Sequence, residues 1–144
     1  DGHSMDATLQ NGERLIINKM VYDFHSPQKG DIIVFHANPT QDYVKRVIAV
    51  GGDLVQEKED ILYINGQAVQ EPYLDKEKKL YPLKDKSYTS DFGPITIPNG
   101  KIFVLGDNRP VSNDSRYIGP VDVKQVVGRA DFSLWPINTF HKLN

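Results

Sequence analysis

The segment that follows the apolar run 102–105 carries a dense set of side chains able to do chemistry. Its eleven residues, from position 106 to 116, include two Asp, two Arg and two Ser. Planar pairs of Arg with carboxylates can hold a loop in one geometry. This density of charge directly after a strand predicts a functional site, in which such pairs pin the loop against a neighbouring strand: Asp107, Arg109, Asp114 and Arg116.

Ser4 and Lys45 are candidates for another kind of chemistry, the attack of a serine hydroxyl on a carbonyl. Serine is a weak nucleophile until a base removes its proton. In a strand, Lys45 shares its face with Tyr43, Val47 and Ala49, so its stem enters apolar surroundings. Burial disfavours the ammonium, and lowering its pKa from ~10.4 to about 7 or 8 requires about 3 to 4 kcal/mol. The spacing alone also fits a structural lysine whose amine reaches water, and a loop serine without chemistry.

These residues belong to a set of motifs that extends over nearly the whole chain. The motifs are Gly2-His3-Ser4-Met5 followed by Thr8-Leu9 and Gly12-Glu13, Asp31-Ile32-Ile33-Val34-Phe35, Tyr43-Val44-Lys45-Arg46-Val47, and Gly106-Asp107-Asn108-Arg109 with Asp114-Ser115-Arg116. In this order the set resembles the type I signal peptidases, serine proteases that cut secretory signal peptides with a Ser-Lys pair. The sequence departs from the family's pattern at Ala7 and Gly51, where Pro is common, and neither change removes a reacting group.

The resemblance implies a role for each matching residue. Ser4 is the expected nucleophile, and Lys45 is the expected general base that later serves as acid. Ser112 is expected to hydrogen-bond the lysine amine and orient it. The backbone N–H of Ser4 is expected to donate to the oxyanion, an interaction worth roughly 2.7 to 4 kcal/mol. Gly2 lacks the hydroxyl that some relatives add to this oxyanion site, so a second donor must come from elsewhere.

The same resemblance implies how substrate binds. Signal peptides end in small residues, usually Ala-x-Ala, in an extended conformation that can pair with a free strand edge. Shallow apolar pockets would then select the small side chains. The residues expected to contact substrate are Met5, Leu15, Val34, Tyr43 and Val44. These residues also fit an ordinary core.

The chain is expected to be an all-β protein with an antiparallel catalytic core. Short runs rich in Val, Ile, Tyr and Phe recur between turn residues, at 14–18, 31–35, 43–50, 53–57, 61–64, 95–97, 101–105 and 126–134. Asn65-Gly66 predicts a two-residue hairpin, because both residues tolerate positive φ. Long helices are not expected, and only 121–127 offers a helical turn.

We expect two structural parts: a catalytic core from residues 1–52 and 100–144, and a smaller β region inserted between them at 53–99. Within the insert, lysines alternate with acidic residues over 71–93, which predicts an exposed and solvated loop or hairpin. Asp91-Phe92-Gly93 matches the magnesium motif of kinases, but the chain has no Gly-rich phosphate loop, so a turn is expected there. The small insert and this segment resemble Gram-positive members of the family.

Composition excludes several classes of function. The 144 residues carry a net charge of -2, with a sequence pI near 6.1, so no basic field points to nucleic acid. The absence of Cys excludes disulfides, thiolate zinc sites and a Cys nucleophile. The four His lack metal-ligand spacing, so neither a metal nor a cofactor is expected.

No apolar run in the sequence approaches the ~18 residues needed to cross a bilayer. The candidate nucleophile nevertheless lies at position 4, so we expect a further segment to precede this sequence. By resemblance, that segment is an N-terminal membrane anchor, and the catalytic domain lies on the outer face of the cytoplasmic membrane.

Two other functions compete with the signal peptidase. One is a self-cleaving repressor-type peptidase with Ser-Lys chemistry, which cuts an Ala-Gly or Cys-Gly bond in its own chain; neither dipeptide occurs here, nor does a helix-turn-helix pattern. The other is a non-catalytic β module that only binds signal peptides. The presence of Ser4, Lys45 and Ser112 counts against this binding module.

Overall fold

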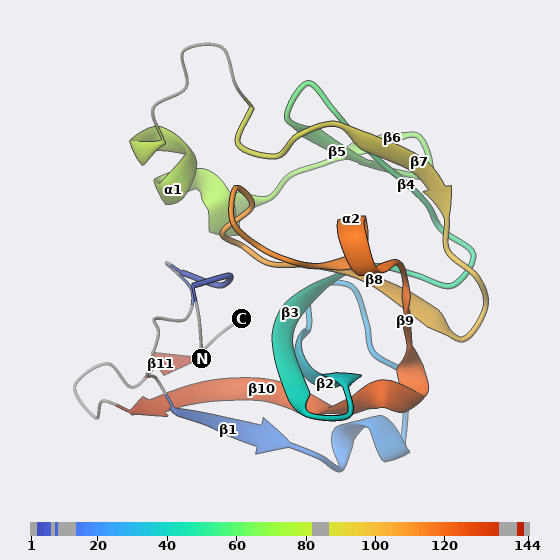
Figure 1. Ribbon diagram of the computed structural model, residues 1–144, viewed down its shortest axis with the longest axis vertical. Helices are drawn as coiled ribbons and strands as arrows, with labels where there is room; N and C mark the ends of the chain where they lie inside the picture. The colour runs from blue at the N-terminus through green and yellow to red at the C-terminus, as the bar shows by residue number, and fades with distance from the viewer. Residues whose placement is uncertain (1–2, 7, 9–13, 82–86, 136–140, 143–144) are drawn as a thin grey trace.

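The computed structural model describes residues 3–6, 8, 14–81, 87–135 and 141–142, and these form two antiparallel sheets (Figure 1). The larger sheet has the strand order β1-β10-β2-β3-β8-β9, with β11 paired to β10. The smaller sheet has the order β6-β5-β4-β7. The prediction of an all-β, antiparallel fold is confirmed.

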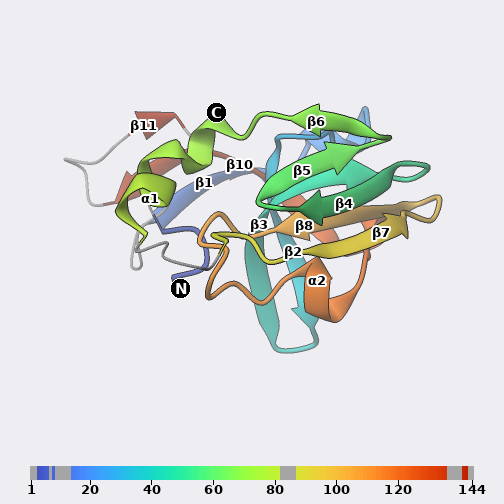
Figure 2. The ribbon, with the colours of Figure 1, turned by 90° about the horizontal axis from the view of Figure 1, so that it is seen from above.

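Each sheet draws on a different part of the sequence. The larger sheet contains β1 (Arg14–Asn18), β2 (Ile32–Asn38), β3 (Gln41–Val50), β8 (Lys101–Leu105), β9 (Val121–Asp122), β10 (Val126–Trp135) and β11 (His141–Lys142). The smaller sheet contains β4 (Leu54–Lys58), β5 (Ile61–Ile64), β6 (Gln67–Val69) and β7 (Phe92–Thr96). Seen from above, the smaller sheet runs across β3 and β8 (Figure 2).

The hairpin predicted at Asn65-Gly66 joins β5 to β6. Both residues have positive φ, 53° and 81°, as a two-residue turn of this kind requires. Leu62 pairs with Val69 and Ile64 with Gln67 across it. The hairpin is therefore confirmed.

Helical segments are short, as expected, but only the one at Val123–Gln125 falls within the predicted turn at 121–127; the other described segments were not predicted. They are α1 (Asp75–Leu80), α2 (Ser115–Ile118) and the 3-10 turns η1 (Val21–Asp23), η2 (Pro72–Leu74) and η3 (Val123–Gln125). No helix among the described residues has the length and apolar character needed to span a membrane.

The expectation of a solvated loop over 71–93 was wrong. Its charge pattern places Asp75 four residues before Lys79, a spacing that stabilises an exposed helix, and the segment forms α1. Leu74, Tyr88 and Thr89 on either side of α1 are buried. The turn expected at 91–93 was also wrong, because β7 begins at Phe92. Residues 82–86 lie outside the described part of the chain.

Strand β3 contacts all three apolar clusters of the core. One cluster lies between the two sheets and includes Ala49, Val55 and Phe103. A second lies on the face of β2 and β3 that carries Val47, and the third includes Val44 on their other face. A register shift between Val47 and Ala49 moves Ala49 into the cluster between the sheets. The expected grouping of Ala49 on the face of Lys45 was therefore wrong, because alternation stops at this bulge.

Candidate active site

The charged loop after β8 begins at Gly106, which lies against both Ser112 and Ser4. A Cβ atom at Gly106 would lie 2.1 Å from Ser112 Oγ and 2.7 Å from the backbone oxygen of Ser4. These distances are far below van der Waals contact, so only glycine permits this packing. The Gly106 N–H also donates to Asp114 Oδ2 at 3.0 Å, which closes the loop on itself.

The turn that carries Ser4 is bound to this loop by Asn108. The Asn108 N–H donates to the Ser4 oxygen at 2.7 Å, and its side-chain Nδ2 donates to the His3 oxygen at 2.9 Å. The neighbouring Met5 is 3% exposed, and its sulfur accepts from the Asp107 N–H at 3.2 Å. The half-buried Ser4 is therefore held in a fixed relation to residues 106–108. The other motif positions Gly2, Ala7, Leu9, Gly12 and Glu13 lie outside the described residues.

Lys45 is buried in β3, with 4% of its surface exposed. Its amine nitrogen lies 5.1 Å from the centre of the Tyr43 ring. Burial lowers the pKa of Lys45 to about 8; repulsion by Arg116 adds to the shift, whereas attraction by Asp114 opposes it. A lysine with this pKa is partly unprotonated near neutral pH and can act as a base.

Ser112 offers a hydroxyl in the same loop as these two charged neighbours of Lys45. Its Oγ is buried and has no hydrogen-bond partner among the described residues. A buried hydroxyl without a partner is unusual, since such groups are normally paired. Its position against Gly106 also puts it close to the backbone of Ser4.

Two Arg-carboxylate pairs fix the loop, and one of them joins it to the lysine strand. Arg46, which follows Lys45 on the opposite face of β3, binds Asp107 with both nitrogens, Nε at 3.0 Å and Nη2 at 2.8 Å. Arg116 binds Asp114 in the same two-pronged way, at 2.8 and 2.9 Å. Arg116 Nη2 also donates to the Arg109 oxygen at 3.0 Å. Both pairs are almost fully buried, so solvent screens them little.

Four residues outside the loop bind either the loop or Arg46, and the sequence analysis gave none of them a role. Thr8 Oγ1 donates to Asp107 Oδ2 at 2.5 Å, and Tyr88 donates to the Asp107 oxygen at 2.8 Å. Glu71 pairs with Arg109 at 2.7 Å, and Tyr73 stacks on Arg46. These residues are remote from the loop in the sequence, and no local pattern indicated these contacts.

The five residues expected to contact substrate fall on two faces of the sheet. Met5, Leu15 and Val44 belong to one apolar cluster, and Val34 lies opposite Val44 on the paired strand. Tyr43 instead lies on the other face, where it packs edge-on against Phe35. The structure thus groups four of the five and separates Tyr43, which lies beside Lys45.

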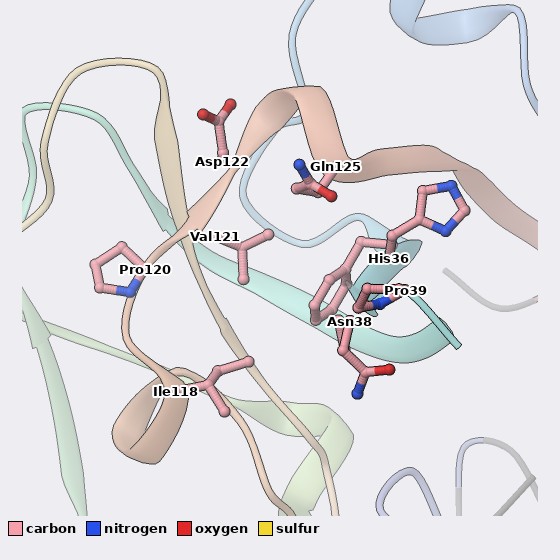
Figure 3. A pocket seen from close by; sticks show the side chains of 10 residues that line it. His36, Asn38, Pro39, Ile118, Pro120, Val121, Asp122 and Gln125 are labelled. Carbon is pink, nitrogen blue, oxygen red and sulfur yellow. The ribbon is translucent and has the colours of Figure 1, made fainter. Parts of the chain in front are cut away.

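An open cavity of about 550 Å³ lies at the end of β2, beyond this Tyr43–Phe35 contact. Figure 3 shows its lining from the β2–β3 turn, with Asn38 and Pro39, and from α2 and β9, with Ile118 and Val121. Neither Ser4 nor Lys45 lines it. Among the described residues, no cluster of three or more His, Asp or Glu could hold a metal ion.

Comparison with known proteins identifies the family. The family model described as "Signal peptidase, peptidase S26" matches residues 1–135. Signal peptidase I of Bacillus caldolyticus is 49% identical, over 97% of this chain and 79% of that protein. Signal peptidase IB of Staphylococcus aureus (strain Mu50) is 44% identical, over 99% of this chain and 80% of that protein. A crystal structure of a signal peptidase I from Enterococcus faecalis V583 is 42% identical, with a TM-score of 0.66, and covers 72% of this chain and 95% of that one. This chain belongs to the signal peptidase family, peptidase S26.

Proposed function

We propose that Ser4 is the nucleophile and Lys45 the general base with which this chain cleaves signal peptides after Ala-x-Ala-like sites. Family membership makes the chain a serine endopeptidase that acts on signal peptides. The observation that carries the proposal is the buried Lys45, whose pKa is lowered to about 8 beside the loop that also binds the Ser4 turn. The match to this family also disfavours a self-cleaving repressor-type peptidase.

In this mechanism the neutral amine of Lys45 takes the proton of Ser4 Oγ as the oxygen attacks the scissile carbonyl. The Ser4 N–H donates to the oxyanion that forms. The protonated Lys45 then gives its proton to the leaving amine, and the acyl group stays on Ser4. Water hydrolyses this ester with Lys45 again as the base. The Ser112 hydroxyl has no hydrogen-bond partner among the described residues and, in this mechanism, would keep the amine directed at Ser4.

The substrate would bind as an added strand along β3. Residues 41–45 of β3 pair with β2 on one side, and β8 pairs with β3 only from Arg46 onward. Among the described strands, the outer edge of residues 41–45 therefore has no partner. An extended signal peptide can form main-chain hydrogen bonds there. Val44 lies in this stretch of β3 and packs with Met5 and Leu15, so this cluster would receive the small side chains of the signal peptide.

The signal peptidase I family is membrane-associated, with its catalytic domain outside the cytoplasm. We propose that an N-terminal anchor holds this domain on the outer face of the cytoplasmic membrane, close to the lipid from which signal peptides emerge. Fusion of a single membrane-spanning segment to this chain tests the anchor. It should raise the cleavage rate for preproteins in vesicles and leave the rate for short soluble peptides unchanged.

The decisive experiment compares cleavage of a preprotein with an Ala-x-Ala site by this chain and by Ser4→Ala and Lys45→Ala. We expect both variants to lose cleavage while circular dichroism shows an intact fold. Ser26→Ala and Lys58→Ala change the same residue types at exposed positions and should cleave normally. Cleavage that survives in Ser4→Ala would overturn the assignment of the nucleophile. Peptide binding without cleavage by the parent chain would support the binding module instead.

A further inference from the structure

We propose that Glu71 and Tyr73 are positioning residues for the reaction: they hold two buried arginines, of which one joins the loop of Ser112 to the strand of Lys45 and the other supports this loop from within. The inference rests on the proposed function, because it concerns the geometry of the same pair. Both residues come from the region at 53–99 that we propose to be an insert, so this insert would serve catalysis without contacting substrate. We call Glu71 and Tyr73, with the two arginines that they contact, the arginine clamp.

One half of the arginine clamp is the ion pair of Glu71 with Arg109. Arg109 is 1% exposed, and its Nη2 donates to Glu71 Oε2 at 2.7 Å. Its Nη1 donates to the buried Thr89 hydroxyl at 3.3 Å, and its Nε donates to the Gly106 oxygen at 2.8 Å. A guanidinium this deeply buried needs a carboxylate nearby, because an unpaired charge in the interior is strongly unfavourable. Glu71 thus allows the buried Arg109 to donate its hydrogen bond to the Gly106 oxygen.

The other half is the stacking of Tyr73 on Arg46. The Arg46 guanidinium carbon lies 3.9 Å from the centre of the Tyr73 ring, while its Nε and Nη2 bind Asp107. A guanidinium between a carboxylate and an aromatic face has little freedom to turn. Arg46 directly follows Lys45 in β3, so a fixed Arg46 also fixes the backbone that carries the lysine.

The two halves share one atom. Glu71 Oε2, which accepts from Arg109, also accepts from the Tyr73 hydroxyl at 2.8 Å. Burial and the nearby Glu71 raise the pKa of Tyr73, so the phenol stays protonated and remains a donor. Figures 1 and 2 both show the start of α1, where η2 ends, beside the loop that follows β8. One short segment therefore restrains the lysine strand and the loop together.

The consequence for the reaction follows from the geometry that this clamp maintains. Arg46 and Arg109 bind Asp107 and Gly106, the first two residues of the loop, and Gly106 contacts both Ser112 and Ser4. A shift of ~1 Å in such a contact can cost on the order of a hundredfold in rate. A looser loop would also admit water to Lys45 and raise the pKa of its amine toward the ordinary value.

The test measures kcat, KM and their pH dependence for an Ala-x-Ala peptide with Glu71→Gln and Tyr73→Leu. We expect kcat to fall at least tenfold at pH 7.5 with KM within about twofold, and the rising limb of the pH-rate profile to move to higher pH. Tyr73→Phe keeps the stacked ring and should lose less than about threefold. Tyr63→Leu, on β5 of the smaller sheet, is the matched control and should change neither quantity.

The melting temperatures of the same variants are also measured. If Glu71 and Tyr73 only stabilise the fold, their variants should have lower melting temperatures but unchanged kcat and pH dependence. If both variants melt earlier but keep the parent's kcat and pH limb, the proposal is overturned. If Glu71→Gln does not fold, Tyr73→Leu decides alone, since it leaves the Arg109 charge paired. Lys45→Ala distinguishes failure of this proposal from failure of the proposed function. If Lys45→Ala is inactive but the Glu71 and Tyr73 variants keep the parent's kcat and pH dependence, only the arginine clamp is refuted. If Lys45→Ala is active, the Ser-Lys pair itself is refuted.

Discussion

At the scale of single residues, two adjacent and similarly buried cations on β3 differ in whether a carboxylate pairs with them. Arg46 is paired with Asp107 through two hydrogen bonds. The amine of Lys45 lies over the Tyr43 ring, and no carboxylate among the described residues lies within ion-pairing distance of it. A buried ammonium without a close counter-charge is destabilised relative to the neutral amine. The strand thus provides a structural cation on one face and, in the proposed mechanism, a base on the other.

The first prediction concerns the pH dependence of cleavage. Only neutral Lys45 can accept the Ser4 proton, and its pKa is lowered to about 8. The kcat/KM should therefore rise about tenfold per pH unit below pH 7 and level off above about pH 9. Initial rates from pH 6 to 9.5 measure this rise, with a peptide that has no charged residues next to the cleavage site. A rate that stays flat over that interval would contradict a lysine base with this pKa.

At the scale of elements, the sequence predicted most strands because their alternation is local. The bounds of β1, β5, β6 and β8 agree with the predicted runs and hairpin. The helix α1 was missed because its charge pattern fits an exposed loop and an exposed helix equally. The bulge after Val47 was missed because it depends on pairing with β8 rather than on local sequence.

The candidate site was predictable where its residues belong to contiguous motifs. Ser4, Lys45 and Ser112 could be nominated in this way, by resemblance. The contacts of Glu71 and Tyr73 could not be predicted in this way. Glu71 lies 38 residues before Arg109, and no local pattern in either segment indicates that the two residues pair. Long-range pairing of this kind is set by the topology of the sheets, which the sequence indicates only in outline.

The second prediction concerns the junction between β8 and the loop. Gly106→Ala should reduce kcat at least a hundredfold and lower the free energy of unfolding by about 1–3 kcal/mol, because its Cβ would overlap Ser112 and the Ser4 backbone. Gly100→Ala, at the other end of β8, is the control. Its φ of +78° strains any side chain, but nothing lies within 4 Å of the new Cβ. Urea unfolding should show comparable losses of stability, and kinetics should show that only Gly106→Ala is inactive. Normal kcat in Gly106→Ala would show that this contact does not set the geometry.

At the scale of the whole molecule, the region between the smaller sheet and the loop at 106–116 contains more carboxyl groups than cationic side chains. Glu57 on β4 is 1% exposed, and both of its carboxylate oxygens lack hydrogen-bond partners among the described residues. Its charged neighbours are Glu71, Asp60, Arg109 and Lys78. Three carboxylates thus face two cations. A neutral Glu57 would balance the charges of the group, so these surroundings favour the protonated form of this carboxyl.

The third prediction follows from the pKa of Glu57. Burial, with Glu71 and Asp60, raises it from 4.5 to about 7, against the opposing effect of Arg109 and Lys78. Between these values the folded state holds a proton that the unfolded state has lost, so stability falls as pH rises through this window. The loss amounts to about 3 kcal/mol by pH 8. The Glu57→Gln variant, which has no such proton, should lack this fall.

Urea unfolding of both proteins at pH 5, 6, 7 and 8 measures the difference directly. All other titrating groups are common to the two chains, so their contributions cancel when the free energies of unfolding are subtracted. We expect Glu57→Gln to gain stability relative to the parent as pH rises from 5 to 8, by up to about 3 kcal/mol. Parallel curves would mean that Glu57 ionises normally. If the gain is found, the pH that makes Lys45 a base also charges Glu57 beside the arginine clamp, so activity would rise over a range in which the fold becomes weaker.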